Sequence, residues 1–189
     1  MNVSLRSKII LIVLFVAFGV ASRFLPHTFN FTPITAIALF ASAYLGLRYS
    51  LITLIGIMLI SDIFIGFYQW QMMIAVYGSF ALSAVLGTFI KKQSVKNIAV
   101  STMGSSLVFY VITNWAVWQF GTMYERSFSG LMQSYLMAIP FFKNSLAGDI
   151  FYTGILFGTI YAITVYKSRM AQKVRAITMG EKLWVEPST

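Results

Sequence analysis

Six long apolar stretches are the feature that most restricts how this chain can fold. They occupy residues 9–22, 34–47, 50–68, 72–90, 98–117 and 144–166. A helical segment of about 20 apolar residues matches the hydrocarbon thickness of a bilayer, and a helix satisfies its own backbone hydrogen bonds where lipid cannot. The pattern therefore predicts an all-α membrane protein with six transmembrane helices in one domain over residues 1–166, followed by a basic tail over residues 167–189.

The composition excludes a water-soluble domain. Hydrophobic residues make up 58% of the chain and charged residues only 10%, whereas soluble domains carry about 25% charged residues. A net charge of +9 would suggest nucleic-acid binding in a soluble protein, but the basic residues form no stripe with aromatic residues on a polar helix. We therefore expect a multi-pass protein of the inner (cytoplasmic) cell membrane, surrounded by the lipid bilayer. We expect no nucleic acid as a partner.

The basic residues predict the orientation of the spans. If the N-terminus lies in the cytoplasm, the inside segments hold 11 Lys and Arg and the outside segments hold three, namely Arg23, Arg126 and Lys143. Cytoplasmic segments are enriched in Lys and Arg, so six spans with both termini inside fit best. The first span also resembles a signal peptide, with a small-residue site at 19–21. A cleaved signal followed by five spans is therefore a second interpretation, although we expect the first span to be retained.

The segment between the fifth and sixth spans is predicted to contain a short interfacial helix on the outer side. Residues 129–138 combine apolar and polar side chains, and Ser127 or Ser129 can serve as the N-cap. Pro140 is expected to end this helix before the sixth span begins.

Two aspartates lie inside predicted spans and are the first candidates for function. Asp62 is 12 residues into the outward-running third span, and Asp149 is near the outer start of the sixth span. A carboxylate in hydrocarbon is costly, so each must face protein or water and find a partner; Arg23, His27 and Lys143 are the candidates. The pair can form a ligand or ion site, or a polar network that fixes helix packing.

Other polar and aromatic residues are predicted at the same outer level. Most of the non-helical polar sequence falls on this side, and a ligand site needs an aromatic-lined hollow with a few polar groups. Trp115 and Trp118 also fit an interfacial aromatic belt. The further candidates are Asn30, Tyr68, Asn114, Trp115, Trp118 and Asn144.

Catalysis is not expected. Two intramembrane aspartates are a feature of intramembrane aspartyl proteases, but the sequence before Asp149 is Leu146-Ala-Gly, which lacks the Gly-x-Gly-Asp pattern. No hydrolase, zinc-protease or phosphate-loop motif occurs. The chain has no cysteine and one histidine, so we predict no metal site and no cofactor.

Several sequence strings together carry a family resemblance. The most specific string is Arg23-Phe-Leu-Pro-His-Thr-Phe-Asn-Phe-Thr-Pro-Ile-Thr-Ala-Ile-Ala-Leu-Phe-Ala41. Supporting strings are Ser61-Asp62 with Gly66-Phe-Tyr68, Thr113-Asn-Trp-Ala-Val-Trp118, Ala138-Ile-Pro-Phe-Phe-Lys-Asn144 and Gly148-Asp149. These strings resemble a bacterial family of uncharacterised membrane transport proteins, which is similar to the substrate-binding S components of energy-coupling factor (ECF) transporters.

The resemblance implies a six-helix protein with the N-terminus inside that binds a small molecule, such as a vitamin, under its outer loops. It also implies that Ala17 and Ala21 form an Ala-x-x-x-Ala motif that docks on an ECF coupling subunit, which works with ATPases. Cobalt ligation by cysteine, known among solitary S-like cobalamin transporters, does not carry over. The alternatives are a structural or assembly protein of the cell envelope and a stand-alone ion-coupled carrier.

Overall fold

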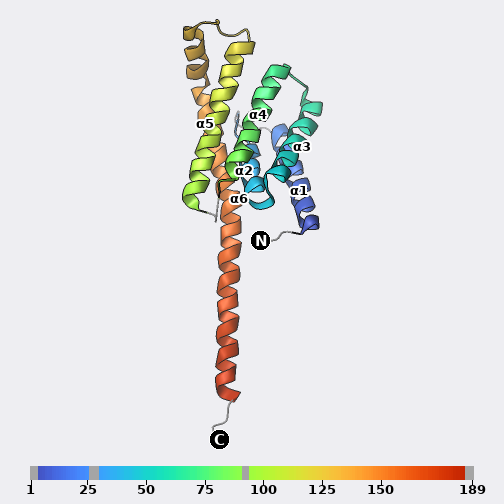
Figure 1. Cartoon of the computed structure of the whole chain (residues 1–189), viewed down its shortest axis with the longest axis vertical. Coiled ribbons are helices and arrows are strands. Elements are labelled where there is room, and N and C mark those ends of the chain that lie inside the picture. The colour runs from blue at the N-terminus through green and yellow to red at the C-terminus, as the bar shows by residue number, and fades with distance from the viewer. Residues whose placement is uncertain (1–3, 26–29, 91–93, 186–189) are drawn as a thin grey trace. The chain divides into compact units, whose positions relative to one another are not determined.

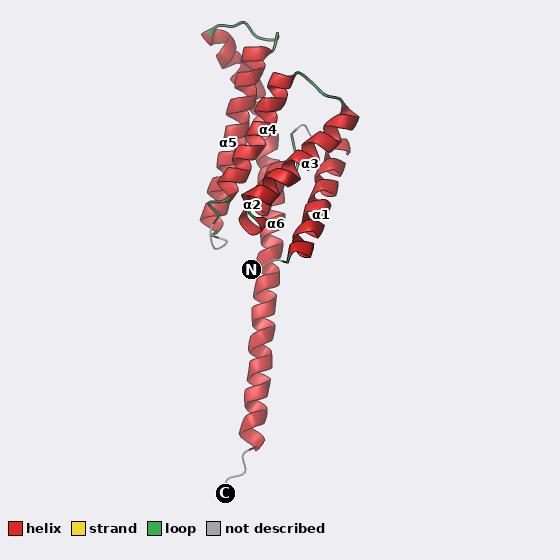
Figure 2. Cartoon of the chain, turned by 45° about the vertical axis from the view of Figure 1, so that its right-hand side comes forward, coloured by secondary structure: helices red, strands yellow, loops and turns green. Residues whose placement is uncertain are grey.

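The computed structural model describes residues 4–25, 30–90 and 94–185, the last 13 of these without their side chains. Within these ranges the regular structure is entirely helical (Figure 2). The elements are α1 (Leu5–Phe24), α2 (Ile34–Leu45), α3 (Leu47–Ile65), α4 (Trp70–Gly87), α5 (Val95–Phe120) and α6 (Phe128–Val185). The first five begin and end within a few residues of the predicted spans.

Five of the helices are long and apolar enough to cross a membrane: α1, α3, α4, α5 and the part of α6 up to Gln172. This agrees with a helical, multi-pass membrane protein. α2 differs, because its 12 residues extend only about 18 Å, against about 30 Å of hydrocarbon. Its residues Ile34–Ser42 are all buried, and it contacts α1, α3, α4 and α5. α2 is thus the central helix of the bundle.

The chain divides into two units, residues 1–156 and residues 157–189. The first unit contains α1–α5 and the first half of α6, and successive helices run in alternating directions (Figure 1). The α1 start, the α2–α3 turn at Gly46 and the α4–α5 connection therefore lie at one end of this unit. The α1–α2, α3–α4 and α5–α6 connections lie at the other. The second unit is the continuation of α6.

Small residues allow the helices of the first unit to approach closely. A Cβ added at Gly19 on α1 would lie 2.6 Å from a side-chain carbon of Ile57 on α3. At Gly87, where α4 ends, an added Cβ would lie 2.8 Å from the backbone oxygen of Leu39 on α2. Real carbon atoms do not approach so closely, so these two contacts fix how α1 meets α3 and how α4 meets α2.

The residues predicted as a short interfacial helix, 129–138, are part of α6, which continues through Pro140, so the prediction that Pro140 ends a helix is wrong. Ser127 does cap a helix, because its Oγ accepts a hydrogen bond from the Gly130 amide at 3.1 Å, but that helix is α6 itself, with Pro140 inside it. Side chains on neighbouring helices can support a helix around a proline. The Tyr110 hydroxyl on α5 donates to the Tyr135 carbonyl at 2.7 Å, and the Tyr135 hydroxyl donates back to the Val111 carbonyl at 3.1 Å.

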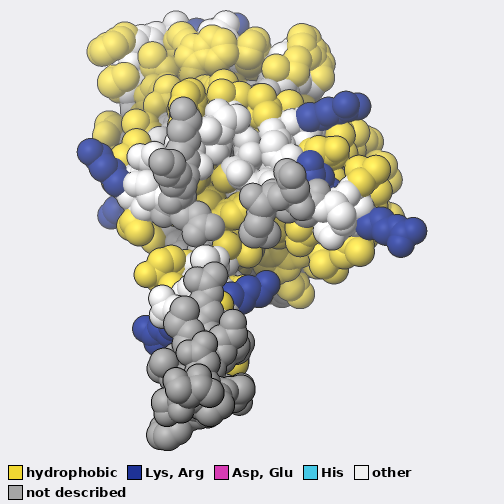
Figure 3. All heavy atoms as spheres, turned by 60° about the horizontal axis from the view of Figure 1, so that its bottom comes forward, with side chains coloured by type: hydrophobic (Ala, Val, Ile, Leu, Met, Phe, Trp, Pro, Cys, Tyr) yellow, Lys and Arg dark blue, Asp and Glu magenta, His cyan; other side chains and the backbone are white. Residues whose placement is uncertain are grey.

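The outside of the first unit is apolar along the helix flanks and basic at one end. Large hydrophobic side chains are exposed on α1, α3, α4 and α5, among them Leu14, Phe64, Ile74 and Leu107. Lys and Arg side chains stand out in a view onto the lower end of the molecule, with hydrophobic side chains around them (Figure 3). An apolar flank of this kind is the surface that a helix bundle presents to lipid.

Candidate functional site

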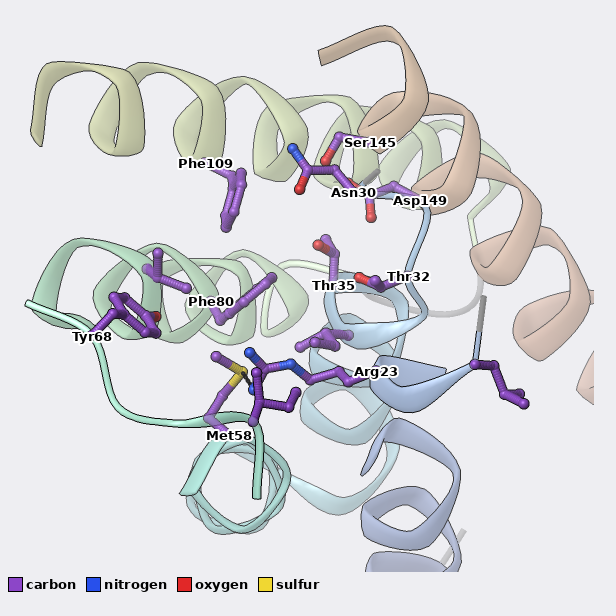
Figure 4. Close-up of a pocket in the computed structure, with 14 residues that line it drawn as sticks. Arg23, Asn30, Thr32, Thr35, Met58, Tyr68, Phe80, Phe109, Ser145 and Asp149 are labelled. Atoms are coloured by element: carbon purple, nitrogen blue, oxygen red, sulfur yellow. Dashed lines mark hydrogen bonds between the residues drawn. The ribbon is translucent and has the colours of Figure 1, made fainter. Parts of the chain in front are cut away.

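A cavity of about 500 Å³ lies inside the first unit, where all six helices contribute to its walls. Its volume falls in the range of small-molecule sites, roughly 300–1,000 Å³. Figure 4 shows polar side chains reaching it from opposite sides, with Arg23 on one and Asp149 on the other. It is lined by Arg23, Leu25, Asn30, Thr32, Ile34, Thr35, Met58, Ile65, Tyr68, Val76, Phe80, Phe109, Ser145 and Asp149.

Arg23 forms the first polar wall, and its ion-pair partner Asp62 is buried and does not itself line the cavity. Nη1 of Arg23, in the last turn of α1, lies 2.6 Å from Oδ1 of Asp62 on α3, and the same nitrogen donates a hydrogen bond to the Ser61 hydroxyl. Asp62 is fully buried and accepts a second hydrogen bond at 2.5 Å from the Tyr77 hydroxyl on α4. The pair and the Tyr77 hydrogen bond therefore join α1, α3 and α4, and of the three candidate partners it is Arg23 that pairs with Asp62.

Asp149 forms the second polar wall and is held by hydroxyl groups. On α6 it is 3% exposed, and its Oδ2 accepts a hydrogen bond at 2.6 Å from Ser106 on α5. Thr35 on α2 interacts with the same carboxylate and lies beside it in Figure 4. Among the described residues, no Lys or Arg lies within ion-pair distance of Asp149.

Residues 30–33, the described part of the connection between α1 and α2, lie on the Asp149 side of the cavity. Gly148 lets this connection approach α6, since a Cβ there would lie 3.1 Å from Cα of Phe31. Asn30 has a left-handed backbone (φ 63°), which asparagine tolerates better than most residues. Its position lines both the main cavity and a second cavity of about 320 Å³, which Asn114 also lines.

Tyr68 closes the opposite side, in the connection between α3 and α4. Burial, together with the Asp62 carboxylate, raises the pKa of the Tyr68 phenol, and Arg23 lowers it by a smaller amount. A phenol is already neutral at neutral pH and the shift moves its pKa further away from that range, so its hydroxyl can donate as well as accept hydrogen bonds.

Comparison with known proteins gives a family without an activity. A family described as "Family of unknown function (DUF6580)" matches residues 3–173. The chain belongs to this family. No curated protein and no solved structure matches it.

Some of the predicted site residues of this DUF6580 chain lie away from the main cavity. Trp115 lies instead on an apolar surface hollow with Trp70 and Phe120, and the indole nitrogen of Trp118 donates to the Glu125 carbonyl. Lys143 is exposed, Asn144 is partly exposed, and neither lines the main cavity. A helix turns by about 100° per residue, so residues near each other in sequence face different sides. His27 lies outside the described residues.

The predicted docking residues are accessible. Ala17 and Ala21 are both exposed on α1, while Phe15 and Gly19 are the buried positions of that helix. The two alanines therefore do not form the contact between α1 and α3, which Gly19 makes.

Sequence reasoning missed several residues of the site in this DUF6580 chain. Tyr77, Ser106 and Thr35 bind the two aspartates, and Phe80 and Phe109 line the cavity. Hydroxyl and aromatic residues are common in transmembrane helices as packing elements, so their type carries little signal. Their helical phase relative to the buried faces was the signal that could have found them.

Proposed function

We propose that this chain is a substrate-binding subunit for the uptake of a small molecule, similar to the S components of ECF transporters. The observation that supports the proposal most directly is the cavity of about 500 Å³ with its polar walls. Such a hollow, inside a bundle whose flanks are apolar, has the volume and the mixture of aromatic and polar groups that ligand sites have.

The proposal includes six spans with both termini in the cytoplasm of the cell that carries the protein. The exposed residues Arg6, Arg48 and Lys96 belong to the end of the first unit that holds the α1 start and the α2–α3 and α4–α5 connections. The positive-inside rule places that end in the cytoplasm. The cavity, which Asn30 and Tyr68 line from the α1–α2 and α3–α4 connections, then faces the outer side, where an uptake protein meets its substrate.

Exposed Ala17 and Ala21 support the proposed docking on an ECF coupling subunit. Small side chains let two transmembrane helices approach closely, and these two positions are not used by α3. ATPases bound to the coupling subunit would supply the energy, because this chain has no phosphate-binding loop.

A thermal-shift screen of the detergent-purified full chain against water-soluble vitamins tests the binding function. A ligand present at 100 times its Kd stabilises the folded state by about 2.7 kcal/mol, so we expect at least one vitamin to raise Tm by several degrees. Replacement Asn30→Gly should reduce that shift, since it removes the amide that lines the cavity and keeps a residue suited to positive φ.

The matched control is Asn97→Ala, at the start of α5, where the side-chain nitrogen donates to the Phe89 carbonyl at 3.4 Å. This variant should show the same ligand-induced shift as the wild type. If no vitamin changes Tm, the binding proposal fails, and the buried aspartates are packing elements of an envelope protein.

A further inference from the structure

The two walls of the cavity differ in charge. Arg23 and Asp62 neutralise each other at 2.6 Å, and Tyr77 adds a neutral hydrogen bond. Asp149 has only neutral hydroxyl partners in the described part of the chain, namely Ser106 and Thr35. The described lining thus carries one carboxylate whose charge nothing compensates.

A carboxylate at this depth either takes up a proton or pairs with a positive charge from elsewhere. Asp149 is 3% exposed, and a buried charge without a partner costs several kcal/mol. Asp149 nevertheless lines the cavity, so a molecule inside it can reach the carboxylate. The hydrogen bonds from Ser106 and Thr35 orient the carboxylate and still leave it lone pairs, since an ionised carboxylate has about four acceptor sites.

Aromatic side chains stand between the two polar walls. The rings of Phe80 on α4 and Phe109 on α5 pack with their centroids 5.0 Å apart, both line the cavity, and Tyr68 lines it as well. Ring faces attract cations within about 6 Å and stack with flat ring systems. An aliphatic anion would lack this ring stacking, and the one positive side chain in the described lining, Arg23, is already paired with Asp62.

The guanidinium group of Arg23 retains hydrogen-bond donors that can bind a ligand in the cavity. Its described contacts to Asp62, Ser61 and Met58 all use Nη1, and a guanidinium group has five N–H donors. Because Arg23 lines the cavity, its Nε and Nη2 groups are available to a hydrogen-bond acceptor on the ligand.

We propose that the cavity selects a flat-ring ligand with one net positive charge. A protonated amine or a charged nitrogen heterocycle pairs with Asp149, the ring lies against Phe80 and Phe109, and an acceptor group on the ligand faces Arg23. This inference names the substrate class of the proposed binding function and therefore rests on it.

Three probes of one ring size test the charge preference: 1-methylnicotinamide (cationic), nicotinamide (neutral) and nicotinate (anionic). Titration calorimetry on the wild-type chain in detergent should give an affinity for the cation at least about tenfold higher than for either of the others, as expected for a charge-assisted contact. Asp149→Asn should reduce this preference to near unity, because it keeps the side chain's shape and removes its charge. Glu125→Gln, at an exposed position, should leave the preference unchanged.

Equal affinities for the three probes in the wild type would overturn the inference, and they are expected if Asp149 carries a proton or a sodium ion instead. Tighter binding of nicotinate, no binding of the cation at millimolar concentration, or a preference that survives in Asp149→Asn would overturn it as well. The three affinities measured on the wild-type chain test the charge preference even if Asp149→Asn does not fold. The binding function itself fails only if the vitamin screen gives no ligand, whereas a vitamin anion that binds in the cavity refutes the charge preference alone.

Discussion

The two buried carboxylates of the first unit are stabilised by different partners. Asp62 has an ion pair with Arg23 and a phenol hydrogen bond from Tyr77, whereas Asp149 has hydroxyl partners on α5 and α2. Removing one member of a buried ion pair leaves the other charge uncompensated, which is more damaging than removing both. At the scale of single residues, Asp62 is therefore expected to serve stability more than Asp149 does.

The Arg23–Asp62 pair can be tested by single and double replacement. Asp62→Asn and Arg23→Gln should each lower the free energy of unfolding by about 3–5 kcal/mol, and the combined variant should recover part of the loss because neither charge is left alone. Thermal unfolding of the purified variants in detergent gives the comparison. Arg48→Gln, at an exposed arginine, should behave as the wild type, and two single variants as stable as the wild type would contradict a structural role for the pair.

Among the elements, the long apolar helices could be predicted from the sequence, and the role of α2 could not. Lipid requires long apolar segments, so hydropathy gives α1, α3, α4 and α5 within a few residues. Nothing in hydropathy distinguishes a short central helix from a short span, because both are apolar. Pro140 was misinterpreted for a related reason: the hydrogen bonds between Tyr110 and Tyr135 that accompany the continuous α6 join residues far apart in sequence.

The candidate site could be predicted in part. Charged residues in apolar spans are expensive, which is why Arg23, Asp62 and Asp149 were found and why Arg23 was named as a partner. Trp115 and Trp118 were grouped with them by depth alone, and depth does not fix the direction in which a side chain points. Ser106 and Tyr77 needed the packing of α5 and α4 against the aspartates, which is a tertiary property.

Close packing of α4 on α2 gives a prediction with a control in the same helix. Gly87→Ala places a Cβ 2.8 Å from the backbone oxygen of Leu39, so α2 or α4 must shift, at a cost of about 1–3 kcal/mol. Gly78→Ala meets no atom within 4 Å and should be neutral or slightly stabilising, since alanine favours helix. Tm of the two variants should differ by several degrees, and equal values would show that the contact can relax.

At the scale of the whole molecule, the basic residues and the cavity both fit the proposed orientation. The end of the first unit with the α1 start carries exposed Arg6 and Arg48, and the opposite end carries connections that line the cavity. A chain that inserted the other way would place these charges outside and the cavity inside, against the charge rule. Orientation therefore connects the sequence-level charge bias with the proposed uptake function.

Because the chain contains no cysteine, each cysteine introduced into it reports on one position. Thr122, exposed between α5 and α6, should react as Thr122→Cys with a membrane-impermeant maleimide added to intact cells. Ser94→Cys, between α4 and α5, and Ser188→Cys, which lies outside the described residues, should react only after permeabilisation, since six spans with the N-terminus inside place both in the cytoplasm. The cysteine-free wild type is the control for background labelling.

Labelling of Ser94→Cys but not Thr122→Cys in intact cells would invert the orientation and place the cavity on the cytoplasmic side, which an uptake subunit cannot use to capture its substrate. Labelling of Ser188→Cys together with Thr122→Cys would instead mean that α6, the helix between these two positions, does not cross the membrane.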